Sequence, residues 1–113
     1  MSTISNKTAE HYTWGNKCDG WHLVKSNSLS VIQERVPPGC AETRHFHNNA
    51  EQFFFILSGI ATMEIEGEVF LVNPHQGIHI PAGSTHQLSN LHENDLVFTV
   101  TSTPPSHGDR VEI

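Results

Sequence analysis

The stretch RHFHNNAEQFFFILSG (residues 44–59) places two histidines and an acid–amide pair directly before a run of three phenylalanines. This neighbourhood of polar and apolar residues has two explanations. Strands often begin with polar residues, so the pattern can arise by chance. Alternatively, the polar residues form a metal site at the mouth of a β-barrel. The rest of the chain favours the second explanation.

His45 and His47 are separated by a single residue. On an extended strand, side chains two positions apart point to the same face, so both imidazoles converge there. The pair alone is a weak signal because the chain holds nine histidines. Downstream, the turn Pro81-Ala82-Gly83 leads into a new strand that has His86 near its start. Such a turn is suited to bring a third imidazole to the first two.

Short runs rich in Val, Ile, Phe, Leu and Thr alternate with Pro, Gly and Asn along most of the chain. Helical periodicity is nearly absent, and this pattern predicts strands. Many short strands at such spacing indicate an all-β sandwich or barrel. The expected strands are 21–25, 29–36, 52–57, 60–66, 69–72, 77–81, 86–91 and 96–102.

The length indicates one domain with a single core. A chain of 113 residues buries about two-thirds of its unfolded surface. We expect the barrel at residues 29–103 and an irregular proline-rich tail at 104–113. The segment 1–28 has Tyr12, Trp14 and Trp21 but few other apolar residues, so we expect it to pack on the barrel or on a second copy.

The charge of the chain argues against two classes of partner. A net charge of −6 with only six Lys and Arg repels nucleic acid and anionic membranes. No stretch is typical of a secretory leader or a transmembrane helix, so we expect a cytoplasmic protein. In that compartment Cys18 and Cys40 are expected to be free thiols.

The first of two motifs resembles that of the small single-domain cupins. It consists of a glycine, five residues, His-x-His, an acidic ligand three or four residues later and, after six more residues, a second glycine. Gly39, His45, His47 and Gly59 occupy these positions.

The second motif resembles the other cupin signature, which has a glycine, five residues, Pro-x-Gly, two residues, a histidine, three residues and an asparagine. Residues 81–83, His86 and Asn90 match it, and His75 stands where the opening glycine is usual. The resemblance covers residues 39–90 and implies an all-β double-stranded β-helix, the jelly-roll barrel of the cupins, with one metal ion inside.

The fourth metal ligand depends on how the first motif is aligned. Glu51 follows His47 after three residues, but seven residues then precede Gly59. Gln52 follows after four, and six residues then reach Gly59. Alternation along the strand does not decide, because Asn48 and Asn49 tolerate turn conformations. We give weight to the spacing within the continuous strand, and some cupins with a Glu-Gln pair use the glutamine.

The resemblance therefore assigns the metal to His45, His47, Gln52 and His86. A glutamine binds through a neutral carbonyl oxygen and leaves the full charge on a divalent ion. This favours Lewis-acid chemistry over oxygen chemistry, because an anionic ligand better stabilises a higher oxidation state. Imidazole ligands suit Ni, Zn, Fe, Mn or Cu, and the sequence does not choose among them.

Three residues are candidates for a catalytic role beyond the metal. Glu51 can contact a ligand of the metal or lie solvated at the rim. His79 can line the barrel or point outward. Arg35 can bind a substrate carboxylate if the odd-numbered residues of its strand face inward.

These observations indicate a metalloenzyme that acts on a small polar metabolite, such as a sugar acid or keto acid. Isomerase or lyase chemistry ranks ahead of dioxygenation. The alternatives are a cupin that binds or senses a small molecule without turnover, and a purely structural barrel. By likeness to other small cupins we expect a homodimer.

Overall fold

The computed structural model of the chain describes residues 2–113, which form eleven β-strands. Met1, the first residue of the expected N-terminal segment, lies outside the described residues. Across residues 2–113 there is no helix long and apolar enough to cross a membrane. The strands are β1 (Glu10–Trp14), β2 (Cys18–Lys25), β3 (Ser30–Val36), β4 (His45–His47), β5 (Glu51–Ser58), β6 (Ala61–Ile65), β7 (Glu68–Val72), β8 (Gly77–Ile80), β9 (His86–Ser89), β10 (Leu96–Thr103) and β11 (Arg110–Glu112).

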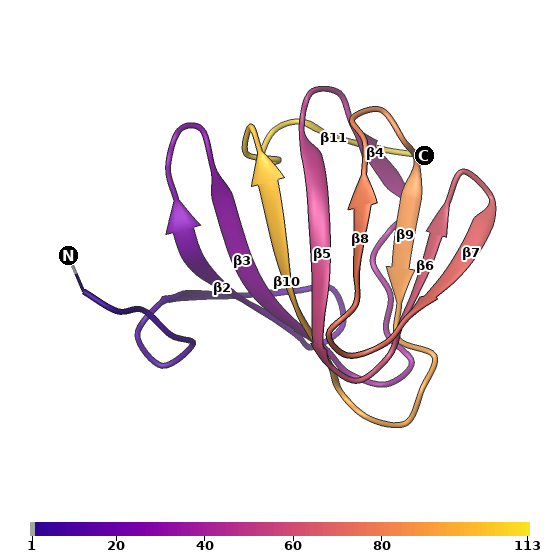
Figure 1. Ribbon diagram of the computed structural model, residues 1–113, viewed down its shortest axis with the longest axis horizontal. Helices are drawn as coiled ribbons and strands as arrows, with labels where there is room; N and C mark the ends of the chain where they lie inside the picture. Colours follow the sequence, from indigo (N-terminus) through magenta and orange to yellow (C-terminus); the bar gives the residue numbers. More distant parts are fainter. Residues whose placement is uncertain (1) are drawn as a thin grey trace.

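The strands form two antiparallel sheets that make a jelly roll (Figure 1). The six-stranded sheet has the order β1-β2-β3-β10-β5-β8, and the five-stranded sheet has the order β11-β4-β9-β6-β7. Strands distant in sequence therefore become neighbours, as where β10 lies between β3 and β5. This architecture confirms the predicted all-β double-stranded β-helix. All eight expected strands are present, and β1, β4 and β11 are added to them.

Regular alternation along the strands builds the core between the sheets. Even-numbered residues are buried along β10 and at 52, 54 and 56 of β5, and the two strands pair so that Phe54 faces Val100 and Gln52 faces Ser102. Successive side chains on a strand point to opposite faces, so one row enters the barrel and the other leaves it. The largest fully buried hydrophobic side chains are Phe98, Ile56, Met63, Ile80, Leu88 and Leu96.

The two ends of the chain extend both sheets. Within the expected segment 1–28, β1 pairs with β2 at the edge of the larger sheet, and Tyr12 and Trp14 pack against the core. In the expected tail, β11 pairs with β4 at the edge of the smaller sheet. The tail is thus more regular than its proline content indicates. The division of the chain at residues 28 and 103 stays a prediction.

Several positions of the motifs have a left-handed backbone, and two of them bear on the sequence pattern. Gly59 has a φ of 79°, and an added Cβ would lie 2.5 Å from the carbonyl oxygen of Asp95. Only glycine fits this close approach without strain. His75, at the place where the second motif usually has a glycine, has a φ of 65°. Histidine is among the residues that tolerate this conformation, which explains how the substitution is accommodated.

Candidate metal centre

Three histidines of the two motifs meet inside the barrel. His45 and His47 lie on β4, and the antiparallel register places His45 opposite His86 of β9. The ring centroids of His45 and His86 are 4.4 Å apart, and those of His45 and His47 are 4.9 Å apart. One ring nitrogen from each of these three buried residues lies within 4.8 Å of the other two. The triad could hold a metal ion.

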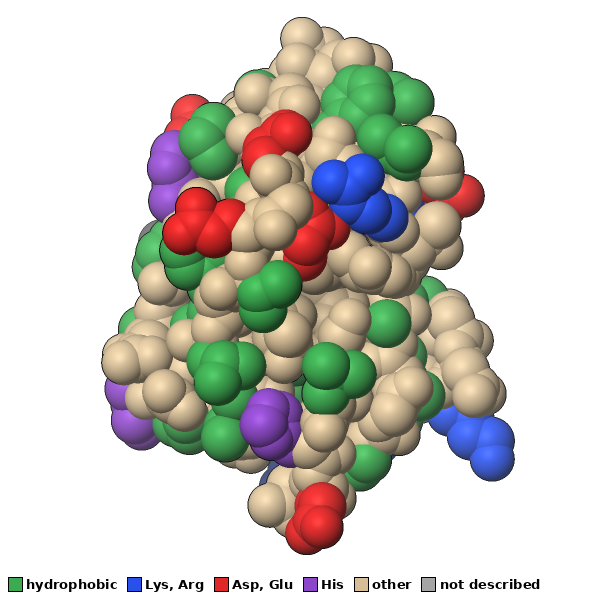
Figure 2. Space-filling view, turned by 90° about the vertical axis from the view of Figure 1, so that its right-hand side faces the viewer, with side chains coloured by type: hydrophobic (Ala, Val, Ile, Leu, Met, Phe, Trp, Pro, Cys, Tyr) green, Lys and Arg blue, Asp and Glu red, His purple; other side chains and the backbone are tan. Residues whose placement is uncertain are grey.

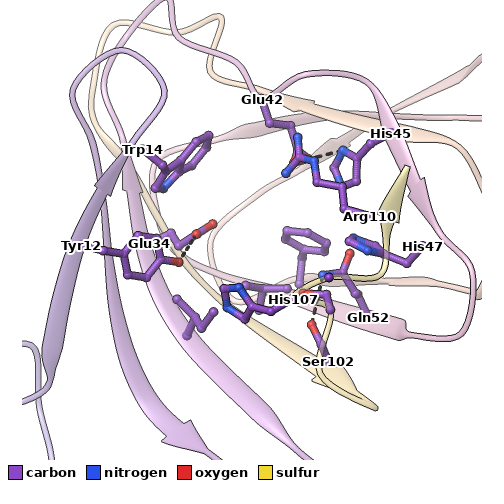
Figure 3. A pocket seen from close by; sticks show the side chains of 15 residues that line it. Tyr12, Trp14, Glu34, Glu42, His45, His47, Gln52, Ser102, His107 and Arg110 are labelled. Atoms are coloured by element: carbon purple, nitrogen blue, oxygen red, sulfur yellow. Dashed lines mark hydrogen bonds and ion pairs between the residues drawn. The ribbon is translucent and has the colours of Figure 1, made fainter. Parts of the chain in front are cut away.

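Gln52 projects into the same pocket from β5 of the opposite sheet (Figure 3). Its Nε2 donates a hydrogen bond to Oγ of Ser102 at 3.0 Å, which fixes the orientation of the amide. Its Oε1 is buried and has no hydrogen-bond partner among the described residues. A buried acceptor without a partner is costly and therefore rare. This oxygen is available to a ligand inside the barrel.

Glu51 on β5 and His79 on β8 lie on the outer face of the larger sheet. Both side chains are more than half exposed, and His79 Nε2 lies 2.8 Å from Oε1 of Glu51. The register of β5 and β8 explains this. Phe53, which lies on the outer row of β5 with Glu51, pairs with His79, whereas Gln52 pairs with the buried Ile80. Neither candidate lines the pocket. Burial thus places Gln52, and not Glu51, beside the histidines.

Arg35 also lies outside the pocket, because β3 alternates in the opposite sense to the expected one. The buried residues of this strand are the even-numbered Ser30, Ile32 and Val36. Arg35 Nε donates to Oδ2 of Asp19 at 2.7 Å, and its Nη1 donates to Oδ2 of Asp95 at 3.3 Å. The arginine is therefore engaged in an ion-pair cluster rather than directed at a substrate.

The histidines are held neutral, with a ring nitrogen free to bind. Burial is the main cause that lowers the pKa of His45, to about 3, and it also lowers the pKa values of His47 and His86. Nδ1 of His45 lies 2.7 Å from the carbonyl oxygen of Thr43, and Nδ1 of His86 lies 2.9 Å from that of Ser84. A carbonyl oxygen only accepts, so each Nδ1 carries the hydrogen and each Nε2 keeps its lone pair.

These residues fit a divalent metal ion. Nε2 of His86 and Oε1 of Gln52 are buried acceptors without partners in the described chain, and a cation satisfies both. Metal–imidazole bonds of about 2.0–2.1 Å place two ligand nitrogens no more than about 4.2 Å apart. The observed upper bound of 4.8 Å needs only small side-chain rotations to reach this value.

The rest of the pocket was not indicated by either motif. The cavity has a volume of about 250 Å³, and a second polar group lines it beside His45, His47 and Gln52. Figure 3 shows Tyr12, Trp14 and Glu34 of this group across the cavity from His45 and His47, whereas Glu42 and Arg110 lie close to His45. No local spacing links the residues of this second group, because they come from β1, β3, the loop before β4 and the C-terminal tail. They are Tyr12, Trp14, Glu34, Glu42, His107 and Arg110.

Two carboxyl groups of this second group have raised pKa values. Tyr12 donates its hydroxyl to Oε2 of Glu34 at 2.7 Å. Burial raises the pKa of Glu34 to about 7, against smaller opposing effects of the Tyr12 hydrogen bond and Arg110. Burial likewise raises the pKa of Glu42 to about 8, with a further contribution from the charge of Glu34. Glu42 accepts a hydrogen bond from the backbone N–H of Leu88 at 3.1 Å.

Similar proteins are found by sequence in both archaea and bacteria. The uncharacterized protein MJ1618 of Methanocaldococcus jannaschii is 30% identical over 89 residues, which are 78% of this chain and 71% of that protein. A mannose-1-phosphate guanylyltransferase of Klebsiella pneumoniae is 31% identical over 77 residues, or 68% of this chain. That stretch is only 16% of the guanylyltransferase, so the likeness concerns one part of a much longer protein.

Solved structures share the fold at low sequence identity. KdgF from a Halomonas species superposes with a TM-score of 0.85 at 19% identity, over 95% of this chain and 98% of that one. A sugar phosphate isomerase of the cupin superfamily from Silicibacter pomeroyi superposes with a TM-score of 0.78 at 19% identity, over 92% of this chain and 76% of that one. The sequence model of the cupin domain matches residues 32–102, which is more than half of the chain. The chain belongs to the cupin family.

Proposed function

We propose that this cupin is a metal-dependent enzyme that acts on a small polar metabolite by isomerase or lyase chemistry. One observation carries the proposal: three neutral imidazoles meet inside the barrel, and two of them line a cavity together with an unpaired amide oxygen and two acidic side chains. Dioxygenase chemistry ranks lower, because the four ligands are all neutral.

The metal ligands in this proposal are His45, His47, His86 and Gln52. A divalent ion held by them would act as a Lewis acid that polarises a substrate oxygen. The chain itself contributes the orientation of the ligands, through the carbonyl groups that hold two imidazoles and through Ser102, which holds the amide. Ligands positioned in this way retain their geometry when an ion binds.

The size and lining of the cavity support a small polar substrate. A volume of about 250 Å³ lies just below the range of about 300–1,000 Å³ that is typical of pockets for drug-sized ligands. Arg110 lines the pocket and offers a guanidinium group, which pairs well with a carboxylate or phosphate. A sugar acid, a keto acid or a small sugar phosphate has the matching size and charge, and the structural likeness to a sugar phosphate isomerase supports this class.

Acidic side chains in the pocket favour an enzyme over a passive binding protein. Burial brings the pKa of Glu34 to about 7, as suits a group that exchanges protons with a substrate. A binding protein has no need of groups poised in this way.

The test begins with elemental analysis of untagged protein purified without chelators, together with His86→Ala. We expect close to one metal ion per chain in the parent and none in the variant. The loaded parent is then incubated with a panel of sugar acids, keto acids and sugar phosphates, and the mixture is followed over time by NMR. Ligand-induced stabilisation without any product indicates a binding protein, and a parent that takes up no metal refutes the proposal.

A further inference from the structure

The hydrogen bond between Tyr12 and Glu34 is set by the register of three adjacent strands. Tyr12 on β1 lies opposite Gly20 on β2, and Gly20 in turn lies opposite Glu34 on β3. A Cβ on Gly20 would collide with the Tyr12 ring. The glycine therefore leaves the space through which the phenol crosses the middle strand and reaches the carboxylate.

Glu34 has one oxygen held and one oxygen free. Tyr12 occupies Oε2 at 2.7 Å, whereas Oε1 forms no hydrogen bond with the described residues. Oε1 of Glu34 is not among the buried atoms that lack a partner, so this unpaired oxygen retains some exposure. Glu34 lines the cavity, so the free oxygen is accessible to a molecule inside it (Figure 3).

The groups around Glu34 have opposing effects on the ionisation of its carboxyl group. Tyr12 on β1 and Arg110 on β11 favour the ionised carboxylate. Glu42 faces it from the loop before β4, and Cys18 lies near it on β2. The buried row of β10, on the other side of β3, carries no charged residue. Burial opposes ionisation and outweighs the favourable contacts, which brings the pKa of Glu34 to about 7.

We propose that Glu34 is the residue that transfers the proton in this pocket and that Tyr12 positions it. This inference rests on the proposed function, for which it names the missing acid–base group. Oε1 of the carboxylate takes a proton from a carbon next to a substrate carbonyl. The C–H electron pair forms a carbon–carbon double bond, and the carbonyl oxygen takes up the negative charge. The carboxylic acid then returns the proton to a carbon of the substrate, which regenerates the carboxylate.

Glu42 does not fit this role, although it lines the same cavity. Its Oε1 accepts the backbone N–H of Leu88, and its Oε2 lies 3.9 Å from Nδ1 of His45. Its side chain is only 10% exposed. Its Oε2 is too far from His45 for a hydrogen bond, but it lies beside this proposed ligand, where the charge of a bound metal ion would oppose protonation of the carboxylate.

The experiment compares the parent with Glu34→Gln, Tyr12→Phe and the control Glu51→Gln, which makes the same change on the exposed face. Each metal-loaded protein is incubated in D2O with 2-oxobutanoate and with dihydroxyacetone, and NMR follows exchange at the carbon next to the carbonyl. We expect Glu34→Gln to lower the exchange rate by about 100-fold or more, as general-base removal does. Metal content and melting temperature should be unchanged, and Glu51→Gln should match the parent.

A second readout needs neither metal nor turnover. The carboxyl carbon of Glu34 is titrated by NMR in the metal-free parent and in Tyr12→Phe. The Tyr12 hydrogen bond lowers the pKa of Glu34, so its loss should move the midpoint of this titration to higher pH. In the metal-loaded proteins, the pH dependence of the exchange rate should move in the same direction. Gly20→Ala, which displaces the phenol, should give the same shift. If Tyr12 and Glu34 had only a structural role, these substitutions would not change the pH dependence of the exchange rate.

The outcomes separate this inference from the function on which it rests. Undiminished exchange in Glu34→Gln, or an ordinary carboxyl midpoint near 4.5 for Glu34, overturns the role of Glu34 and leaves the metalloenzyme standing. If Glu34→Gln fails to fold, Glu34→Asp takes its place. This variant keeps the charge but moves the carboxylate oxygen away from the substrate, so the exchange rate must fall in it. A parent that binds metal but exchanges neither probe also overturns the inference. A parent that binds no metal overturns the proposed function itself.

Discussion

Replacing Gln52 by leucine should leave the stability of the metal-free protein nearly unchanged and lower the stability of the metal-loaded protein. In the metal-free protein the substitution removes a buried oxygen that has no partner among the described residues, which relieves about 1–3 kcal/mol. It also removes the hydrogen bond from Nε2 to Ser102, which contributes about 0.5–1.5 kcal/mol. The substitution also leaves the buried Ser102 hydroxyl without its partner, which costs about 1–3 kcal/mol. These effects largely cancel, so the free energy of unfolding should stay within about 1 kcal/mol of the parent value, or about 4 °C in melting temperature.

In the metal-loaded protein the same substitution removes a ligand. If the affinity falls about 100-fold, then at a metal concentration of about 100 times the parent dissociation constant most of the 2.7 kcal/mol of metal-linked stabilisation is lost. For a chain of this size that loss corresponds to about 10 °C. A substitution that merely damaged the core would instead lower the melting temperature in both states.

The assay is differential scanning calorimetry with and without excess metal, combined with a metal titration. Glu51→Leu is the matched control, because this neighbouring side chain is 56% exposed and pairs only with His79. It should shift either melting temperature by no more than the effect of about 0.5 kcal/mol that is usual for surface substitutions. Retained metal affinity in Gln52→Leu, with loss in Glu51→Leu, would refute the assigned ligand set.

Three further predictions follow from the structure. The metal-free protein should lose about 1 kcal/mol of stability between pH 7.5 and about 9. Burial raises the pKa values of Glu34 and Glu42 to about 7 and 8, so the folded state holds protons that the unfolded state has released. Below this range the buried histidines, whose pKa values are lowered, oppose the slope, because the unfolded chain binds protons that the folded chain does not. Chemical denaturation at several pH values measures this slope, and a flat or rising profile contradicts it. Gly59→Ala should lower the free energy of unfolding by about 3 kcal/mol, because of backbone strain and a clash with a backbone oxygen. Gly67→Ala, with a similar φ but open space around it, should lower it by about 1 kcal/mol. Equal losses in denaturant titrations would show that the contact at Gly59 is unimportant. Light scattering should give the mass of a homodimer, and a monomer mass disproves that expectation.

The fold and the three histidines could be predicted because local rules determine them. Strand alternation and turn residues locate the strands, and the two motifs place the imidazoles at fixed distances from turns. The ends of the chain were harder to predict, since β1 and β11 are short edge strands whose order depends on pairing. The sense of alternation on β3 also could not be read from sequence, because both rows contain apolar residues. This is why Arg35 appeared suitable as a pocket residue.

The choice between Glu51 and Gln52 shows how a distant contact fixes what local reasoning leaves open. The alternation of inward and outward side chains could not be extended across Asn48 and Asn49, because both residues tolerate turn conformations. In the structure the backbone N–H groups of Asn49 and Ala50 both donate to Oδ2 of Asp109, at 2.9 Å each. This carboxylate lies about 60 residues away in sequence and anchors the start of β5, with Ala50 buried and Gln52 on the inner row. Only the spacing to Gly59 carried the same information in the sequence.

The pocket combines two parts that the sequence encodes in different ways. The metal side lies within the motifs, whereas Tyr12 and Glu34 are brought together only by the pairing of β1, β2 and β3 across Gly20. Such a pair leaves no spacing pattern, because its residues are 22 positions apart and either could be replaced without disturbing a motif. One barrel can thus retain a metal centre while the opposite wall changes, and this separation explains how a single fold supports unrelated reactions. For this chain, we expect the reaction to depend on the wall that carries Glu34 more than on the proposed metal ligands.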